Sequence, residues 1–368
     1  MVNDLIYNPN YAVPPGETLL DTLEELNMTQ AELAKRMNRP TKTINEIIKG
    51  KAEITPTTAL ELEMTTGVPA QLWNNLERNY RTQLASIKER ESFIEQIDFL
   101  DAIPVKEMIK RGWIQKYKDS VDQLVEVLKF YRLSTVEAWD AIWGNELADN
   151  VAFRKALTYE SDKGAISAWL RQGEIEAEKI ICQPFDKQKF RFLLQNDVRE
   201  LTTESNPEVF LPKLIKLCSD VGVAVVLIKE LPKCRVNGAT YWVSSDKAVI
   251  QLSARYKSDD HLWFTFFHEA GHIVLHGKKE TFLETGNKTE EEVLKEQEAD
   301  KFASETLIPS NLYNKFSLRR IFISHQTVTD FAEEIGIAPG IVVGRLQHDG
   351  MIPYTHLNKL KIRYTWAD

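Results

Sequence analysis

The stretch HLWFTFFHEAGHIVLHG, residues 261–277, decides how the C-terminal half of this chain is interpreted. His268 and His272 lie four residues apart, with Glu269 directly after the first, inside an apolar and aromatic run. Residues four apart on a helix lie on the same face one turn along the axis, so both imidazoles can reach one ion. Glu269 points in another direction, where it can reach a water molecule on that ion. The spacing predicts a zinc site, in which three protein ligands leave a fourth position for water.

A third ligand is needed, and the sequence offers three candidates. His276 continues the four-residue spacing, but a straight helix cannot bring three successive turns around one ion, so His276 is expected to be a neighbour of the site. The other two lie in EEEVLKEQEADKFASETLIP, residues 290–309. Glu296 shares the apolar face of this helix, whereas Glu298 lies about 160° away and is expected to point outward. We choose Glu296, with Asp300 one turn later placed to accept a hydrogen bond from a zinc-bound histidine.

These residues resemble the paired motifs of a known family. TFFHEAGHIVLHG followed by EQEADKFASETLIP is similar to the ImmA/IrrE family of bacterial zinc metallopeptidases, over residues 210–310. The resemblance implies a gluzincin-like site with zinc on His268, His272 and Glu296, and with Glu269 as the general base. It also implies a task, in which the enzyme cuts a DNA-bound repressor or antitoxin and so derepresses genes.

The chemistry of peptide cleavage adds further expectations. Glu269 would take a proton from water and pass it to the leaving amine. The oxyanion of the intermediate needs one more donor, for which Tyr256, His261 and His276 are candidates. The substrate is expected to lie extended along residues 248–252 as an added β-strand.

Short strands are predicted before the histidine helix. VGVAVVLIKEL, residues 221–231, is a β-branched run of strand type, and residues 238–253 indicate two strands around a turn at Ser244 to Asp246. A small sheet followed by a helix is an α+β arrangement. The whole chain is therefore predicted to be α+β and mostly helical, with a zincin-like domain near the C-terminus.

The N-terminal part contains a second motif, MTQAELAKRMNRPTKTINEIIKGK, residues 28–51. Thr29 and Glu32 have the spacing of a capping box, and a short break follows the first helix. Thr41 or Thr43 can cap a second helix. Two short helices joined by a tight turn form the helix-turn-helix pattern, whose second helix enters the major groove of DNA.

The charge pattern favours DNA binding at this place only. Residues 35–51 hold six basic side chains and one acidic one, whereas the whole chain has a formal net charge of −8. Such a balance excludes binding of nucleic acid over the entire surface. The side chains expected to reach bases or phosphates are Arg39, Lys42, Thr43, Asn45, Glu46, Lys49 and Lys51. Residues 14–80 resemble the phage-repressor-like (XRE) domain of HigA-type antitoxins, which implies a homodimer on a palindromic double-stranded DNA operator.

The rest of the sequence carries weaker signals. Residues 81–206 are predicted to be helical, with tryptophans as core anchors at positions 113, 139, 143 and 169. Three widely spaced cysteines, without a CxxC pair, are expected to be buried apolar residues. No apolar run is long enough to span a bilayer and no signal peptide begins the chain, so a cytoplasmic location without membrane contact is expected. Residues 328–350 repeat the hydrophobic layout of residues 30–52 with little of its charge, which predicts a degenerate helix-turn-helix-like unit that serves packing or partner binding and not DNA binding.

These patterns predict four parts. Residues 1–80 form a DNA-binding domain, 81–206 a helical connecting region, 207–310 a zinc metallopeptidase domain, and 311–368 a helical C-terminal region. The predicted function is a transcriptional regulator fused to a zinc-dependent endopeptidase. The alternative is a non-catalytic, antitoxin-like repressor with a structural or vestigial metal site.

Overall fold

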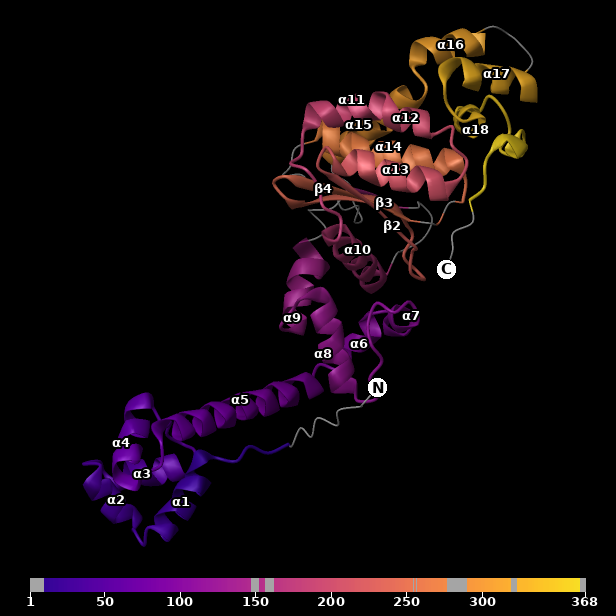
Figure 1. Ribbon diagram of the computed structural model, residues 1–368. Helices are drawn as coiled ribbons and strands as arrows, with labels where there is room; N and C mark the ends of the chain where they lie inside the picture. Colours follow the sequence, from indigo (N-terminus) through magenta and orange to yellow (C-terminus); the bar gives the residue numbers. More distant parts are fainter. Residues whose placement is uncertain are drawn as a thin grey trace. The chain divides into compact units, whose positions relative to one another are not determined.

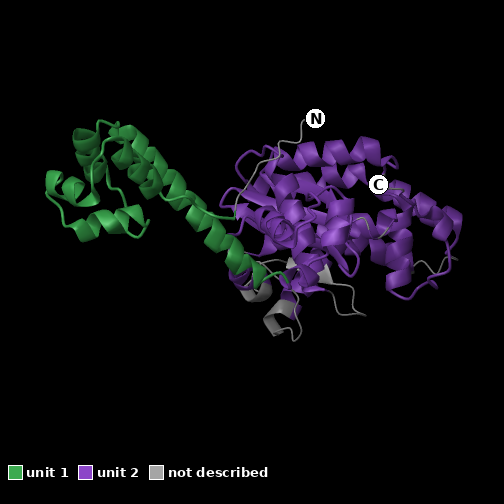
Figure 2. Ribbon diagram, turned by 90° about the horizontal axis from the view of Figure 1, so that it is seen from below, with its two compact units in different colours: residues 1–97 green, residues 98–368 purple. Residues whose placement is uncertain are grey.

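The computed structural model describes residues 10–146, 152–155, 162–253, 255, 257–276, 290–318 and 323–364. The chain divides into two compact units, residues 1–97 and 98–368 (Figure 2). No helix among these residues is long and apolar enough to cross a membrane. Each unit has its own hydrophobic core.

Unit 1 is entirely helical in its described part. Its helices are α1 (Pro15–Glu25), α2 (Gln30–Arg36), α3 (Thr41–Ile48), α4 (Pro56–Thr66) and α5 (Ala70–Ile94). Leu19, Leu33, Ile44, Leu62 and Trp73 contribute one side chain each from these five helices to a shared core. The predicted helix-turn-helix is confirmed as α2 and α3. Helix α5 continues through residue 81, so the expected boundary at residue 80 lies inside a helix.

Two details of helix capping differ from the sequence prediction. The hydroxyl of Thr29 accepts from the backbone N–H of Glu32 at 3.1 Å, but the Glu32 carboxylate pairs with Arg36 instead of returning to the cap. Helix α3 begins after Pro40 with no side-chain cap, so the prediction that Thr41 or Thr43 caps it is wrong. Pro40 already has an extended backbone, which makes Thr41 the first helical residue.

Unit 2 contains one sheet and many helices. Its strands are β1 (Ala152–Lys155), β2 (Val223–Ile228), β3 (Val236–Ser244) and β4 (Lys247–Ser253). Its helices before β2 are α6 (Phe99–Ala102), α7 (Val105–Lys110), α8 (Ser120–Tyr131), α9 (Val136–Trp139), η1 (Asp140–Glu146), α10 (Lys163–Glu178), α11 (Lys187–Gln195), α12 (Asp197–Leu201) and α13 (Pro207–Ser219). Those after β4 are α14 (Asp259–Leu275), α15 (Glu290–Leu307), α16 (Ser310–Leu318), α17 (His325–Ile335), α18 (Pro339–His348) and η3 (Asn358–Leu360).

The sheet has the order β1-β3-β4-β2. Strands β3 and β4 form the predicted hairpin, and β2 runs parallel to β4. Strand β1 pairs with the other edge of β3, and this strand was not predicted. Because β4 lies between β3 and β2, both of its edges are already hydrogen-bonded, and the expectation that a substrate adds to residues 248–252 is wrong.

Helices cover both faces of this sheet. Figure 1 shows α10 on one face and the group α11 to α15 on the other. The side chains of β2 alternate accordingly, because Val223 and Val225 join the core with α14 whereas Ala224 and Val226 join the core with α10. Trp169 of α10 is buried and donates from its indole N–H to the carbonyl of Ile228 at 2.8 Å.

The C-terminal helices pack against the histidine helix. Helix α18 packs the buried Gly340 and the half-buried Gly344 against the N-terminal turn of α14, where a Cβ on either glycine would overlap the carboxylate of Asp259 or Asp260. The second helix of the degenerate helix-turn-helix is therefore part of the core and is not available to enter a DNA groove.

Candidate metal centre and DNA-binding surface

Helix α14 carries the two predicted metal-binding histidines through the core of unit 2. The rings of His268 and His272 are buried, and their Nε2 atoms lie 3.1 Å apart. This close approach follows from the four-residue spacing, which places both rings on one face of the helix. The two Nε2 atoms therefore mark one point to which an ion can bind.

Helix α15 brings Glu296 to the same point. Its carboxylate oxygens lie 3.4 Å from Nε2 of His268 and 3.4 Å from Nε2 of His272. One ligand atom from each of these three residues lies within 4.8 Å of the others, so the group can hold a metal ion. Gly271 permits this approach, since a Cβ there would lie 3.3 Å from Cα of Ala299 on α15.

The outer nitrogen of His268 is also held. Its Nδ1 lies 2.8 Å from Oδ1 of Asp300, which is the partner expected from the sequence. Burial lowers the pKa of His268, but hydrogen bonds to Asp300 and Glu296 outweigh it and raise the pKa to about 9. A carboxylate on Nδ1 fixes the ring and leaves Nε2 facing the other two ligand atoms, as metal-binding histidines require. The donor set fits a zinc ion, which prefers imidazole and carboxylate ligands.

Glu269 lies beside the three-residue group without belonging to it. It is fully buried, and its Oε2 accepts a hydrogen bond from Oγ1 of Thr240 at 2.8 Å. Gly238 of β3 makes room for it, because a Cβ there would lie 2.6 Å from Oε1 of Glu269. Neither Thr240 nor Gly238 was predicted, although the glycine inside a strand sequence is a signal of close approach.

Strand β3 is irregular at this position. Phe153 of β1 pairs with Ala239, and two residues later Lys155 pairs with Val236, three residues back along β3. The extra residue makes a β-bulge, which is a feature that redirects side chains next to functional sites. The bulge lies at Asn237 and Gly238, immediately before the strand residues that contact Glu269.

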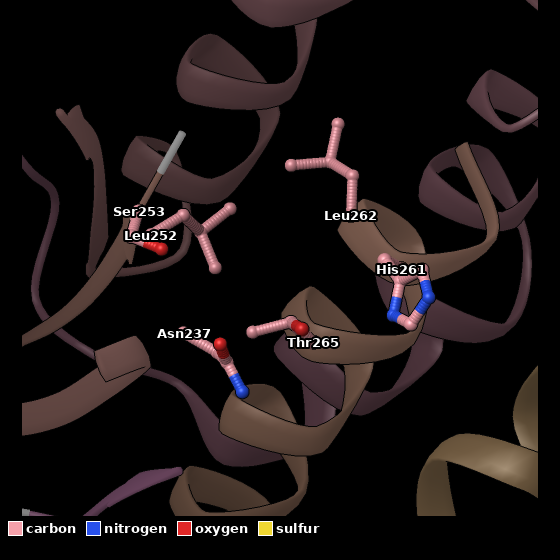
Figure 3. A pocket seen from close by; sticks show the side chains of 6 residues that line it. All are labelled: Asn237, Leu252, Ser253, His261, Leu262 and Thr265. Atoms are coloured by element: carbon pink, nitrogen blue, oxygen red, sulfur yellow. The ribbon is translucent and has the colours of Figure 1, made fainter. Parts of the chain in front are cut away.

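A small cavity lies next to this bulge (Figure 3). It measures about 10 Å³ and is lined by Asn237, Leu252, Ser253, His261, Leu262 and Thr265. Oδ1 of Asn237 and Oγ of Ser253 are buried and have no hydrogen-bond partner among the described residues. A polar cavity of this size holds about one water molecule. Thr265 precedes Glu269 by one helical turn, so the cavity is adjacent to the candidate site.

His276 lies behind His272 and does not face the metal group. Its Nδ1 is 3.0 Å from Nδ1 of His272, and its Nε2 is 3.2 Å from Oε2 of Glu298. His276 was considered as a catalytic donor to the oxyanion. This placement does not fit that role, because His276 contacts Nδ1 of His272, whereas the metal group lies at Nε2 of the same ring. His261 lies at the small cavity, and Tyr256 lies outside the described residues.

The expected DNA-binding residues differ in their exposure and in their contacts. Arg39 is half-buried and donates to both carboxylate oxygens of Glu61 on α4, at 2.6 and 3.3 Å. It therefore ties the turn to α4, and its role as a DNA contact stays a prediction. Lys42, Lys49 and Lys51 are exposed. The other expected DNA-binding residues, which lie on α3 and are half-exposed, are Thr43, Asn45 and Glu46.

Two domain families match the chain. A helix-turn-helix matches residues 19–73, and an IrrE N-terminal-like domain of a peptidase family matches residues 218–347. The HTH-type transcriptional regulator YddM of Escherichia coli is 35% identical over 63 residues, which are 17% of this chain and 67% of YddM. This chain belongs to the helix-turn-helix regulators and carries an IrrE-like peptidase domain. The IrrE-like match includes α17 and continues into α18, beyond the residue 310 at which the motif resemblance ended.

Solved structures resemble the helix-turn-helix part of this regulator. A HigA-family antidote protein of an addiction module from Coxiella burnetii is 34% identical, covers 23% of this chain and 92% of its own, and has a TM-score of 0.21. An antidote protein of a plasmid maintenance system from Nostoc punctiforme is 28% identical, with coverages of 23% and 92% and a TM-score of 0.22. The antitoxin HigA of Pseudomonas aeruginosa, solved with the higBA promoter, is 27% identical, with coverages of 23% and 91% and a TM-score of 0.21.

Proposed function

We propose that this regulator is a zinc-dependent endopeptidase joined to a sequence-specific DNA-binding domain. One observation carries the proposal. His268, His272 and Glu296 bring three ligand atoms within 4.8 Å of one another, and Glu269, the residue after His268, is fully buried and outside that group. Three ligands and a separate acid–base residue are the division of roles that hydrolytic zinc sites need.

The chain's own residues would perform the proton transfers. Zinc on His268, His272 and Glu296 would polarise the scissile carbonyl and make water more acidic. Glu269 accepts the proton of the attacking water and then delivers it to the nitrogen of the leaving amine, as the C–N bond breaks. The hydrogen bond from Thr240 fixes Oε2 of the Glu269 carboxylate, and we assign the proton transfers to its Oε1. This oxygen lies beside Gly238, on the face of β3 that packs against α14.

The substrate and the operator follow from the joining of the two domains. The exposed Lys42 on α3, with the exposed Lys49 and Lys51 directly after this helix, supports binding to double-stranded DNA, with a homodimer on a palindromic site. A peptidase tethered to this domain would meet proteins bound at the same operator. We infer that the cleaved partner is a repressor or an antitoxin-like protein.

The second candidate is a non-catalytic repressor with a structural metal site. The burial of the site favours this candidate, because Glu269 and His268 are both fully buried. A structural zinc has four protein ligands, whereas a catalytic zinc keeps one position for water. Only three ligand residues meet at this site within the described part of the chain, which supports the enzyme.

The variant Glu269→Gln separates these candidates. The amide preserves the shape of the side chain but cannot accept the proton, so cleavage should fall by at least ~100-fold while zinc content and operator binding remain. The measurement is a comparison of newly formed protein termini in cells that express the unaltered protein or the variant, together with a reporter of the target promoter. If no new terminus depends on Glu269 and the reporter responds equally to both proteins, the enzyme proposal fails.

A further inference from the structure

The two histidines of the metal group are held in different ways at their outer nitrogens. His268 meets the carboxylate of Asp300 directly, at 2.8 Å. His272 meets a second histidine, since its Nδ1 lies 3.0 Å from Nδ1 of His276. The far nitrogen of His276, Nε2, lies 3.2 Å from Oε2 of Glu298. A carboxylate therefore ends both hydrogen-bond paths, but the second path passes through an additional imidazole.

The chemistry of a metal ligand determines where the protons lie in this second path. If Nε2 of His272 gives its lone pair to the metal, its Nδ1 carries the proton and donates. Nδ1 of His276 must then accept, which places the remaining proton of that neutral ring on Nε2. This N–H donates to the carboxylate of Glu298. An ionised carboxylate has no proton, so it can only be the acceptor. Each of the two contacts thus has one donor and one acceptor.

Helix geometry explains why these residues meet. His276 is the C-cap residue directly after α14, and its backbone N–H still donates to the carbonyl of His272 at 3.0 Å, so it follows His272 on the same side of the helix. Its side chain is buried, with 5% exposed, whereas that of Glu298 is 50% exposed. Glu298 was expected to point outward from α15, and it does lie at the surface, but its carboxylate still reaches the buried ring. The path therefore joins the surface to the metal group.

We propose that His276 and Glu298 are positioning residues that fix the tautomer and the orientation of His272. This proposal rests on the proposed zinc site, in which His272 is a ligand. Neither residue belongs to the group that would hold the metal, and both act through His272. Outer partners of this kind change metal affinity by about 10- to 100-fold when they are removed.

The test measures zinc affinity of the full chain by competition with a chelator of known affinity. His276→Phe keeps a ring in the space but cannot accept the proton of His272, so the Kd for zinc should rise by roughly 10- to 100-fold. Glu298→Ala should raise it less, because the carboxylate is half exposed. Glu298→Gln keeps an oxygen that accepts from His276 and should recover most of the affinity. The matched control is Gln297→Ala, an exposed neighbour on α15 that should change nothing.

Two further readouts distinguish positioning from a loss of stability. In the double variant, Glu298→Ala should add no further loss to His276→Phe, because the path is already broken. The absorption spectrum of bound Co²⁺ should change in His276→Phe, since the angle of His272 at the metal changes, while the melting temperature of the metal-free protein stays close to that of the unaltered one.

The outcomes are separable from those of the proposed function. Unchanged zinc affinity in His276→Phe, with zinc bound by the unaltered protein, would overturn the positioning role alone. Fully additive losses in the double variant would do the same. Failure of the unaltered protein to bind zinc at all would overturn both the proposed function and this inference.

Discussion

Thr240 of β3 donates a hydrogen bond from Oγ1 to Oε2 of Glu269 at 2.8 Å, and the same hydroxyl lies 3.1 Å from the carbonyl oxygen of Glu269. Both residues are buried. The sheet thus holds the candidate general base, while the metal group is built by α14 and α15. This separation allows the two parts of the site to be altered independently.

The first prediction concerns this hydrogen bond. Thr240→Val has nearly the same shape but no hydroxyl, so Glu269 loses one fixed partner. Hydrogen bonds to charged groups contribute about 1.5–3 kcal/mol, and we expect the rate of peptide cleavage to fall by about 10- to 100-fold. Zinc content should not change, because Thr240 does not contact the metal group. Thr240→Ser should keep most of the activity, and a Thr240→Val variant with full activity would contradict the proposed role of this contact.

The second prediction concerns the third ligand. Glu296→Ala should remove most of the bound zinc, because a three-ligand site that loses one ligand holds the ion far less tightly. Glu298→Ala should keep substantially more zinc, since Glu298 contacts His276 and not the metal group. Zinc is measured per protein after dialysis against a defined free-zinc buffer. The assignment would be reversed if Glu298→Ala lost its zinc and Glu296→Ala kept it.

The third prediction concerns DNA. Replacing Lys42 and Lys49 with Ala should weaken operator binding and reduce the salt dependence by about one unit of log–log slope per lost phosphate contact. Arg39→Ala is the comparison, because Arg39 pairs with Glu61. It should lower the melting temperature of the helix-turn-helix with a smaller change in salt slope. If operator binding by the double lysine variant has the same salt dependence as that of the unaltered protein, Lys42 and Lys49 do not contact DNA phosphates.

The fourth prediction concerns pH and Asp259, at the N-terminal turn of α14. Its Oδ1 accepts from the backbone N–H groups of Asp260 and Ile362, at 2.9 and 3.1 Å, and the residue is fully buried. Burial and then the charge of Asp260 raise the pKa of Asp259 from 3.8 to about 7. Between these two values the folded state binds more protons than the unfolded state, so stability falls as pH rises from about 4 to about 7.

The size of this effect follows from the shift. About three pH units at 1.36 kcal/mol per unit correspond to a loss on the order of 4 kcal/mol across this range, with little further change above pH 7. Asp259→Asn cannot ionise and should remove this contribution while keeping an oxygen for the two backbone donors. The measurement is the free energy of unfolding of unit 2 at several pH values. An identical slope for the variant and the unaltered protein would assign the pH dependence to another group.

Much of the fold was predictable because its signals are local. The four-residue spacing of His268 and His272 determines that both rings share a helix face, whatever surrounds the helix. The continuous apolar run from Val223 to Val226 similarly predicts a strand, and such a run is typical of a strand that is covered on both faces. The choice of Glu296 over Glu298 also rests on helix periodicity, and the structure brings Glu296 to the two histidines.

Other features were not predictable because they depend on contacts between distant segments. The side chain of Arg39 has the charge and position of a DNA contact, and only the packing of α4 brings Glu61 within reach of it. Strand β1 has no distinctive sequence pattern of its own. It pairs with the edge of β3 that does not contact β4, and the sequence did not predict this pairing. The central place of β4 likewise follows from sheet order, which hairpin signals do not specify.

The sequence by itself determined the identities of the candidate metal ligands and the helix face on which each lies, since side-chain direction on a helix follows from its 3.6-residue period. Only the tertiary structure decided which atoms hold Glu269 and His276. Thr240 lies 29 residues from Glu269 and Glu298 lies 22 residues from His276, so each contact exists only after the sheet and the two helices have packed. Hydrogen bonds need distances near 3 Å, and periodicity along a single helix cannot specify distances between elements.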